Sequence, residues 1–154
     1  MASRPKIPEG LWFAVPLRDS GFGIGVVARA NRGVLLGYFF GPRRKEPPAL
    51  VDLSTLQADD AIWVSKFGYL GLRDGDWPVI GALENWKRDA WPMPVFARHE
   101  EVTGRWLQVV YDDTDPNKFV REIPVSEGAA KGSPEDGLAG PGFVEIHLAG
   151  LLGT

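Results

Sequence analysis

Short apolar segments separated by turn-forming residues fill the first part of the chain. They lie at residues 11–17 (LWFAVPL), 22–30 (FGIGVVARA) and 34–40 (VLLGYFF), with glycine-containing turns between them. Runs rich in β-branched and aromatic residues are typical of strands, and the short turns favour antiparallel pairing. The pattern therefore predicts a three-stranded meander. Gly23 and Gly25 alternate with apolar residues in its second segment, which indicates a bend or a close approach by another backbone.

The second half of the chain repeats this alternation of strands and turns less regularly. Further strands are expected at 79–81, 95–98, 105–111 and 119–125. The last two would pair as a hairpin, because the DDTDPNK sequence between them is a strong turn signal. Together with the first meander, these segments predict a mostly β fold. We expect a curled antiparallel meander or a small barrel-like sheet, with one or two short helices.

Other segments are predicted to be helical, irregular or ambiguous. A short helix is expected at 56–63, with Asp52 or Ser54 as its cap. Segment 66–75 is punctuated by glycine and is expected to be irregular. Segment 127–142 is rich in Gly, Ala and Pro and is the longest candidate for a mobile loop. The C-terminal segment 143–152 fits both a helical face and a strand alternation, so both interpretations stay open.

The stretch 75–96 contains three of the six tryptophans and two Trp-Pro pairs, at Trp77 and Trp91. Tryptophan buries a large apolar ring and keeps one N–H to satisfy. The proline that follows disfavours the helical conformation for the tryptophan and holds it extended. We therefore expect both rings to be pinned in the core, where they specify the fold and carry no chemistry.

Composition limits the class of protein. The 154 residues are 44% apolar and 24% charged, as in an ordinary globular protein, and predict a single domain over 1–154. There is no cysteine, which suits a reducing cytoplasm. The N-terminal sequence lacks the apolar region of a signal peptide, and no apolar run is long enough for a membrane helix. We therefore expect a cytoplasmic protein that does not contact a membrane.

The net charge of −3 conceals an uneven distribution. Residues 1–50 carry eight Lys/Arg and three Asp/Glu, whereas residues 51–154 carry nine Lys/Arg and seventeen Asp/Glu. A nucleic-acid-binding domain is expected to be basic, so nucleic acid is a disfavoured partner. The acidic part of the chain is better suited to a basic protein partner.

The residues that could bind a metal or catalyse a reaction lack the neighbouring residues that such a site requires. Asp112, Asp113 and Asp115 have neither the central glycine nor the closing glutamate of a calcium loop. His99 and Glu100 are neighbours on a predicted strand and would point to opposite faces. With no cysteine, two histidines and no serine-based motif, the sequence predicts no enzyme, no metal site and no cofactor.

Acidic residues in turn and loop segments are the candidate partner-binding residues. Because turns lie at the surface, we expect all five to be exposed and free to bind. They are Asp112, Asp113, Asp115, Glu135 and Asp136. A competing hypothesis is a partner held by apolar and aromatic contacts through Phe39, Phe40 or Trp86.

Several motifs, taken in order, resemble the immunity protein 26 family of bacterial polymorphic toxin systems over roughly residues 7–150. This resemblance implies a mostly β, non-catalytic protein without a cofactor, which binds and neutralises a cognate toxin in the cytoplasm of the producing cell. A nuclease, with its basic surface, is the kind of toxin that the acidic residues would suit. The motifs are IPEG (7–10), FAVPL (13–17), GVVAR (25–29), LGYFFG (36–41), FGYLGL (67–72), WPVIG (77–81), WPMP (91–94), DGL (136–138) and GFVEI (142–146).

Two other functions are kept as alternatives. The opening meander with its bent second strand would also fit a small SH3-like barrel, a module associated with nucleic acids. An enzyme that uses the region of His99 or Asp112 is the third candidate. The residues alone do not decide among these functions.

Overall fold

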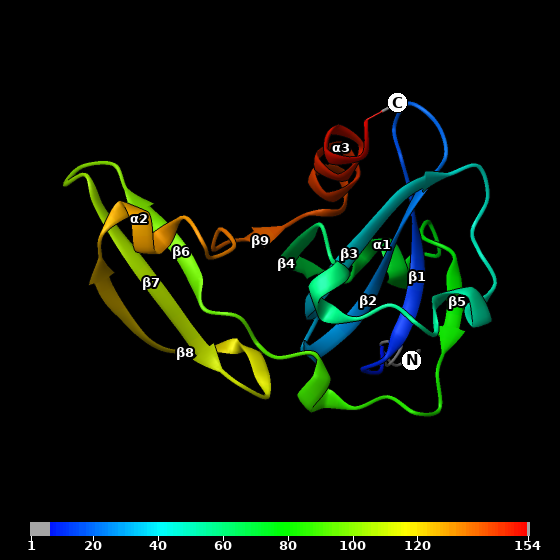
Figure 1. Ribbon diagram of the computed structural model, residues 1–154, viewed down its shortest axis with the longest axis horizontal. Coiled ribbons are helices and arrows are strands. Elements are labelled where there is room, and N and C mark those ends of the chain that lie inside the picture. Colours follow the sequence, from blue (N-terminus) through cyan, green and yellow to red (C-terminus); the bar gives the residue numbers. More distant parts are fainter. Residues whose placement is uncertain (1–6, 154) are drawn as a thin grey trace.

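The computed structural model describes residues 7–153, which form nine strands in two sheets (Figure 1). The larger sheet has the strand order β5-β1-β2-β3-β4-β9, and the smaller has the order β6-β7-β8. The bounds of the larger sheet's strands are β1 Leu11–Pro16, β2 Phe22–Asn31, β3 Val34–Arg44, β4 Trp63–Gly68, β5 Val79–Ala82 and β9 Leu138–Ala139. Those of the smaller sheet are β6 Phe96–Glu100, β7 Arg105–Asp112 and β8 Asp115–Val125.

Three α-helices lie among the described residues: α1 (Leu70–Arg73), α2 (Glu127–Ala130) and α3 (Pro141–Leu152). Three short 3₁₀ turns accompany them, η1 (Leu50–Leu53), η2 (Ala58–Asp60) and η3 (Arg88–Ala90). In Figure 1 the two sheets lie next to each other, and the chain around β9 leads from the smaller sheet to α3 on the larger one. Within residues 7–153 no helix is long and apolar enough to span a membrane.

The central strands of the larger sheet are buried on both faces. Successive residues point to opposite sides of a strand, so Trp12 and Phe13 enter different cores. The first core contains Trp12, Val26 and Phe40, and the smaller sheet covers it with Phe96 and Val109. The second core contains Phe13, Val27, Phe39 and Phe67, and α3 covers it with Val144 and Leu148.

The tryptophans of the two Trp-Pro pairs pack on opposite faces of this sheet. Trp77 is 1% exposed in the second core, where it stacks on Phe13 with ring centroids 5.7 Å apart. Its Nε1 donates a hydrogen bond of 2.9 Å to Glu145 on α3. Trp91 is 7% exposed in the first core, edge-on to Trp12. The prediction that both rings are buried is therefore confirmed.

The mostly β fold, the opening meander and the β7–β8 hairpin predicted from the sequence are confirmed. The sheets do not close into a barrel. At Gly23 an added Cβ would lie 2.5 Å from Leu148 of α3, so the glycine permits this helix to approach β2 closely.

The prediction of a helix at 56–63 is wrong. Only a single 3₁₀ turn, η2, forms there, and Trp63 begins β4 by pairing with Phe39 of β3. The free edge of β3 stabilises an extended chain, and this long-range pairing overrides the local preference.

Two later segments also differ from expectation. Segment 66–75 is not irregular, since it contains the end of β4 and α1. Segment 127–142 was expected to be one loop, yet it forms α2, β9 and the first residues of α3. The ambiguous segment 143–152 is helical, and α3 begins at Pro141, whose fixed φ suits the first turn of a helix.

Candidate functional site

The five candidate acidic residues fall into two groups next to the smaller sheet. Asp112, Asp113 and Asp115 lie at the turn between β7 and β8. Glu135 and Asp136 lie beside β6, where an isolated parallel bridge pairs Glu135 with Ala97. The two groups have different surroundings, which decide which carboxylates are available to a partner.

The hairpin turn is held to the larger sheet by a buried arginine. Arg29 of β2 is 1% exposed, and its Nε donates a 2.5 Å hydrogen bond to the carbonyl oxygen of Asp113. Its Nη1 donates to the carbonyl of Trp91, and its Nη2 lies 3.6 Å from the Asp113 carboxylate. The next polar residue of β2, Asn31, donates to the Asp115 carboxylate at 3.0 Å. These contacts join the two sheets.

The Asp112 carboxylate is hydrogen-bonded within its own turn. Its carboxylate accepts hydrogen bonds from the backbone N–H and the hydroxyl of Thr114, at 3.0 and 2.7 Å. These bonds, the hydroxyl's first, hold the pKa of Asp112 below its usual range. The carboxylate thus stabilises the turn that presents Asp113.

Asp136 forms a second buried link between the sheets. Its carboxylate lies 3.2 Å from Nζ of Lys66 on β4 and accepts a 2.8 Å hydrogen bond from the hydroxyl of Tyr111 on β7. Lys66 is 6% exposed, and its ammonium lies 3.5 Å from the centre of the Tyr111 ring. Burial lowers the pKa of Lys66, which Asp136 partly opposes. Burial, followed by the bond to Asp136, raises the pKa of Tyr111.

The expectation that all five acidic residues are exposed and free is therefore wrong. Asp136 is half-buried and paired, Asp112 and Asp115 are half-buried, and Asp113 lies beside Arg29. Glu135 is exposed, and among residues 7–153 no hydrogen bond or ion pair reaches its carboxylate. The sequence signal was the same for all five, since each lies in a turn or loop segment, and only the fold separates them.

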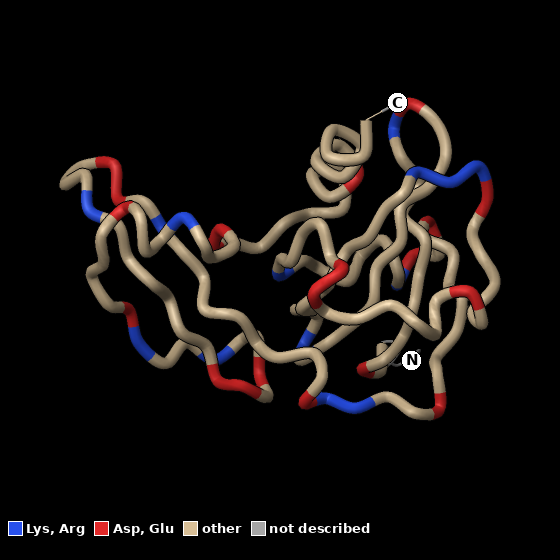
Figure 2. The backbone as a smooth tube through the Cα atoms, in the orientation of Figure 1, with Lys and Arg blue, Asp and Glu red and all other residues tan. Residues whose placement is uncertain are grey.

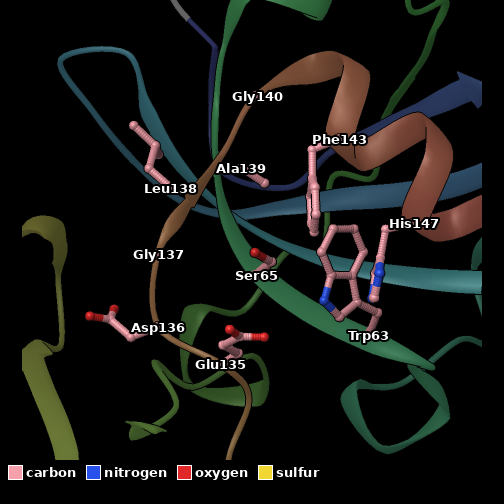
Figure 3. Close-up of a pocket in the computed structure, with 10 residues that line it drawn as sticks. All are labelled: Trp63, Ser65, Glu135, Asp136, Gly137, Leu138, Ala139, Gly140, Phe143 and His147. Atoms are coloured by element: carbon pink, nitrogen blue, oxygen red, sulfur yellow. The ribbon is translucent and has the colours of Figure 1, made fainter. Parts of the chain in front are cut away.

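A pocket of about 310 Å³ lies beside Glu135 (Figure 3). Trp63 and Ser65 of β4 line one side, the extended segment 137–140 another, and Phe143 and His147 of α3 the third. The rings of Trp63 and His147 lie 4.6 Å apart, and His147 stacks on Phe143 at 5.3 Å. The pocket is thus a partly aromatic hollow in which a helix, a strand and an extended segment meet.

The two neighbouring acidic residues point to opposite sides of this extended segment. Figure 3 shows the Glu135 carboxylate on the side of Trp63 and the Asp136 carboxylate turned away from it. Alternation along an extended chain produces this arrangement. Glu135 therefore gives the pocket a negative charge, while the charge of Asp136 is balanced by Lys66.

The rim of the pocket is apolar and exposed. Leu138 and Phe143, which both line the pocket, are 59% and 57% exposed. Figure 2 shows α3 almost free of charged residues, with Glu145 as the exception. An exposed apolar patch next to an acidic residue is typical of a protein-binding surface.

The aromatic residues that the sequence proposed for binding are differently placed. Phe39 and Phe40 are 0% and 1% exposed, so neither can contact a partner. Trp86 is half-buried and stacks on Trp91. Sequence reasoning missed Trp63, Phe143 and His147. The spacing of Phe143 and His147, four residues apart on one helical face, was the available signal for two of them.

The remaining sequence candidates for chemistry are dispersed. His99 stacks on Trp106 in the smaller sheet, whereas His147 lies on α3. Within the described part of the chain, no three His, Cys, Asp or Glu side chains are grouped as metal ligands. The side chains around the pocket can therefore recognise a partner through the charge of Glu135 and through aromatic contacts.

Comparisons with known proteins give one match. The sequence model of the family described as Immunity protein 26 matches residues 8–108. No curated protein and no solved structure matches. The matched stretch ends inside β7, so the pocket combines Trp63 and Ser65 from the matched part with residues 135–147 from beyond it.

Proposed function

The chain belongs to the immunity protein 26 family, and from this premise we propose that it binds and neutralises a cognate toxin of a bacterial polymorphic toxin system without catalysing a reaction. The family match supports the immunity role. The observation that carries the proposed binding surface is the Glu135 carboxylate, which has no partner among residues 7–153 and lies beside a partly aromatic pocket. Neutralisation would take place in the cytoplasm of the producing cell.

The proposed partner has a basic surface, and a nuclease is the proposed class. Enzymes that act on nucleic acids bind phosphates with Lys and Arg, so their substrate surface is positively charged. An acidic inhibitor is attracted to that surface and covers it. In this proposal Glu135 makes direct contact. Asp112, Asp113 and Asp115 add to the negative potential from the nearby turn, and Asp136 holds the segment that carries Glu135.

The nucleic-acid-associated alternative has less support. It depended on a small, curled SH3-like barrel, and the two sheets do not close into a barrel. A carboxylate in the candidate pocket would repel phosphate groups. The same surface is better suited to a protein that itself binds phosphates.

The proposal is tested by co-expression with the toxic domain encoded next to the gene. We expect the wild-type chain to restore growth and to form a stoichiometric complex with the purified toxic domain. Growth arrest that persists despite soluble expression of the chain, with no complex at micromolar concentrations, would refute an immunity function for this pair.

A further inference from the structure

Two side chains of the pocket offer hydrogen-bond acceptors, the Glu135 carboxylate and the Ser65 hydroxyl, and the indole N–H of Trp63 lines it as a donor. Glu135 contributes a carboxylate that has no partner among residues 7–153. The Ser65 hydroxyl donates its hydrogen to the carbonyl of Lys66 at 3.0 Å, so lone pairs remain for a ligand. The nearest buried cation, Lys66, is engaged by Asp136 and Tyr111. This set of groups favours a ligand that carries positive charge and several N–H donors.

The walls of the pocket favour a planar cation. Trp63, Phe143 and His147 present aromatic rings within 4.6–6.4 Å of one another. A guanidinium group stacks on aromatic faces and carries five N–H donors with no acceptor, whereas an ammonium is compact and strongly hydrated. A volume of about 310 Å³ is at the lower end of small-molecule pockets, which suits one side chain.

We infer that this pocket receives an arginine side chain of the toxin, an inference that rests on the proposed immunity function. The guanidinium stacks on Trp63 and Phe143 and donates to the Glu135 carboxylate. The aliphatic part of the arginine passes along the segment 137–140, which lines the same pocket. The toxin's arginine is thereby removed from its own substrate surface.

The inference can be tested on the isolated chain with N-acetyl-arginine amide as the probe. Binding is followed by the indole N–H signal of Trp63 in a nitrogen-labelled sample, assigned with a Trp63→Phe variant. We expect saturable shifts with a dissociation constant in the millimolar range. The neutral isostere N-acetyl-citrulline amide should cause no saturable shift, and N-acetyl-lysine amide should bind more weakly.

Variants then identify the groups that bind the probe. Glu135→Gln should weaken arginine binding about tenfold, because it removes a charge-assisted hydrogen bond. Phe143→Ala should weaken it by a smaller factor through loss of stacking. Glu101→Gln is the matched control, since Glu101 is also exposed but lies in the turn between β6 and β7.

The outcomes separate this inference from the proposed function. Equal shifts with arginine and citrulline probes, or binding that Glu135→Gln leaves unchanged, would overturn the arginine pocket even if co-expression restores growth. Conversely, selective arginine binding together with failure to neutralise the toxin would refute the immunity proposal for that toxin and leave the pocket's chemistry established.

Discussion

The two sheets of this protein are stabilised by different means. The central strands of the larger sheet are buried on both faces between aromatic cores, whereas eight of the eleven residues of β8 in the smaller sheet are exposed. The smaller sheet is attached through Phe96 and Val109 and through the buried cations Arg29 and Lys66. The larger sheet is thus the stable scaffold, and the polar links decide where the segment carrying Glu135 lies on it.

The largest expected effect lies in the aromatic core of the larger sheet. Trp77→Ala should lower the free energy of unfolding by about 3–5 kcal/mol, because it leaves a cavity beside Phe13 and removes the bond to Glu145. Trp106→Ala in the smaller sheet is the control. Its ring is half-buried against His99, so we expect a loss of about 1 kcal/mol. Equal losses in urea denaturation would contradict the contrast between the sheets.

The buried polar links should come next. Asp136→Asn leaves the Lys66 ammonium buried without its counter-ion and should cost about 2–4 kcal/mol. Replacing both partners, with Lys66→Met and Asp136→Leu together, should cost less than the sum of the two single changes, because no unpaired charge remains. Strict additivity in the double-mutant cycle would show that the pair does not join the sheets energetically.

The contacts of Arg29 with the turn between β7 and β8 allow its backbone partners to be compared with its carboxylate partner. Arg29→Met removes hydrogen bonds to three backbone carbonyls, those of Ala28, Trp91 and Asp113, and should cost about 2–4 kcal/mol. Asp113→Asn should cost under about 1 kcal/mol, because the carboxylate lies 3.6 Å from Arg29 and is 68% exposed. If the two variants have the same melting temperature, the carboxylate and not the backbone is the main partner of Arg29.

A smaller effect is expected at Tyr111, and it should depend on pH. At neutral pH Tyr111→Phe removes one hydrogen bond to Asp136 and should cost about 1 kcal/mol. The pKa of Tyr111 is raised in the folded protein from its unfolded value of 10.0. Above pH 10 the unfolded chain therefore loses a proton that the native state keeps, so stability falls as pH rises. The variant lacks this loss, and its deficit relative to wild type should shrink above pH 10.

Local sequence patterns predicted those parts of the fold that depend on neighbouring residues. The meander and the β7–β8 hairpin join segments across short turns, and the Trp-Pro pairs indicated burial directly. The strand at Trp63 was missed because it forms only against the edge of β3. Lys66 and Asp136 are 70 residues apart, and nothing in either neighbourhood indicates their pairing.

The site was predictable in part for the same reason. An acidic loop at Glu135 and Asp136 was identified, but the direction of each carboxylate follows from the bridge to Ala97 and the pairing of β9 with β4. The latter also brings Trp63 near Phe143. Neighbouring residues of one extended segment therefore have different roles, since Asp136 joins the sheets and Glu135 faces the pocket.

The most direct test of this account is the rate at which the chain associates with its toxin. Glu135→Lys should slow association about threefold to tenfold at low salt, because it reverses the charge in the pocket, and by much less at 1 M salt, where screening is strong. Glu101→Lys, the same reversal in the turn between β6 and β7, should leave the rate nearly unchanged. If both variants slow association equally, the effect comes from the overall charge of the chain and not from the pocket. No slowing by Glu135→Lys would contradict binding through this pocket.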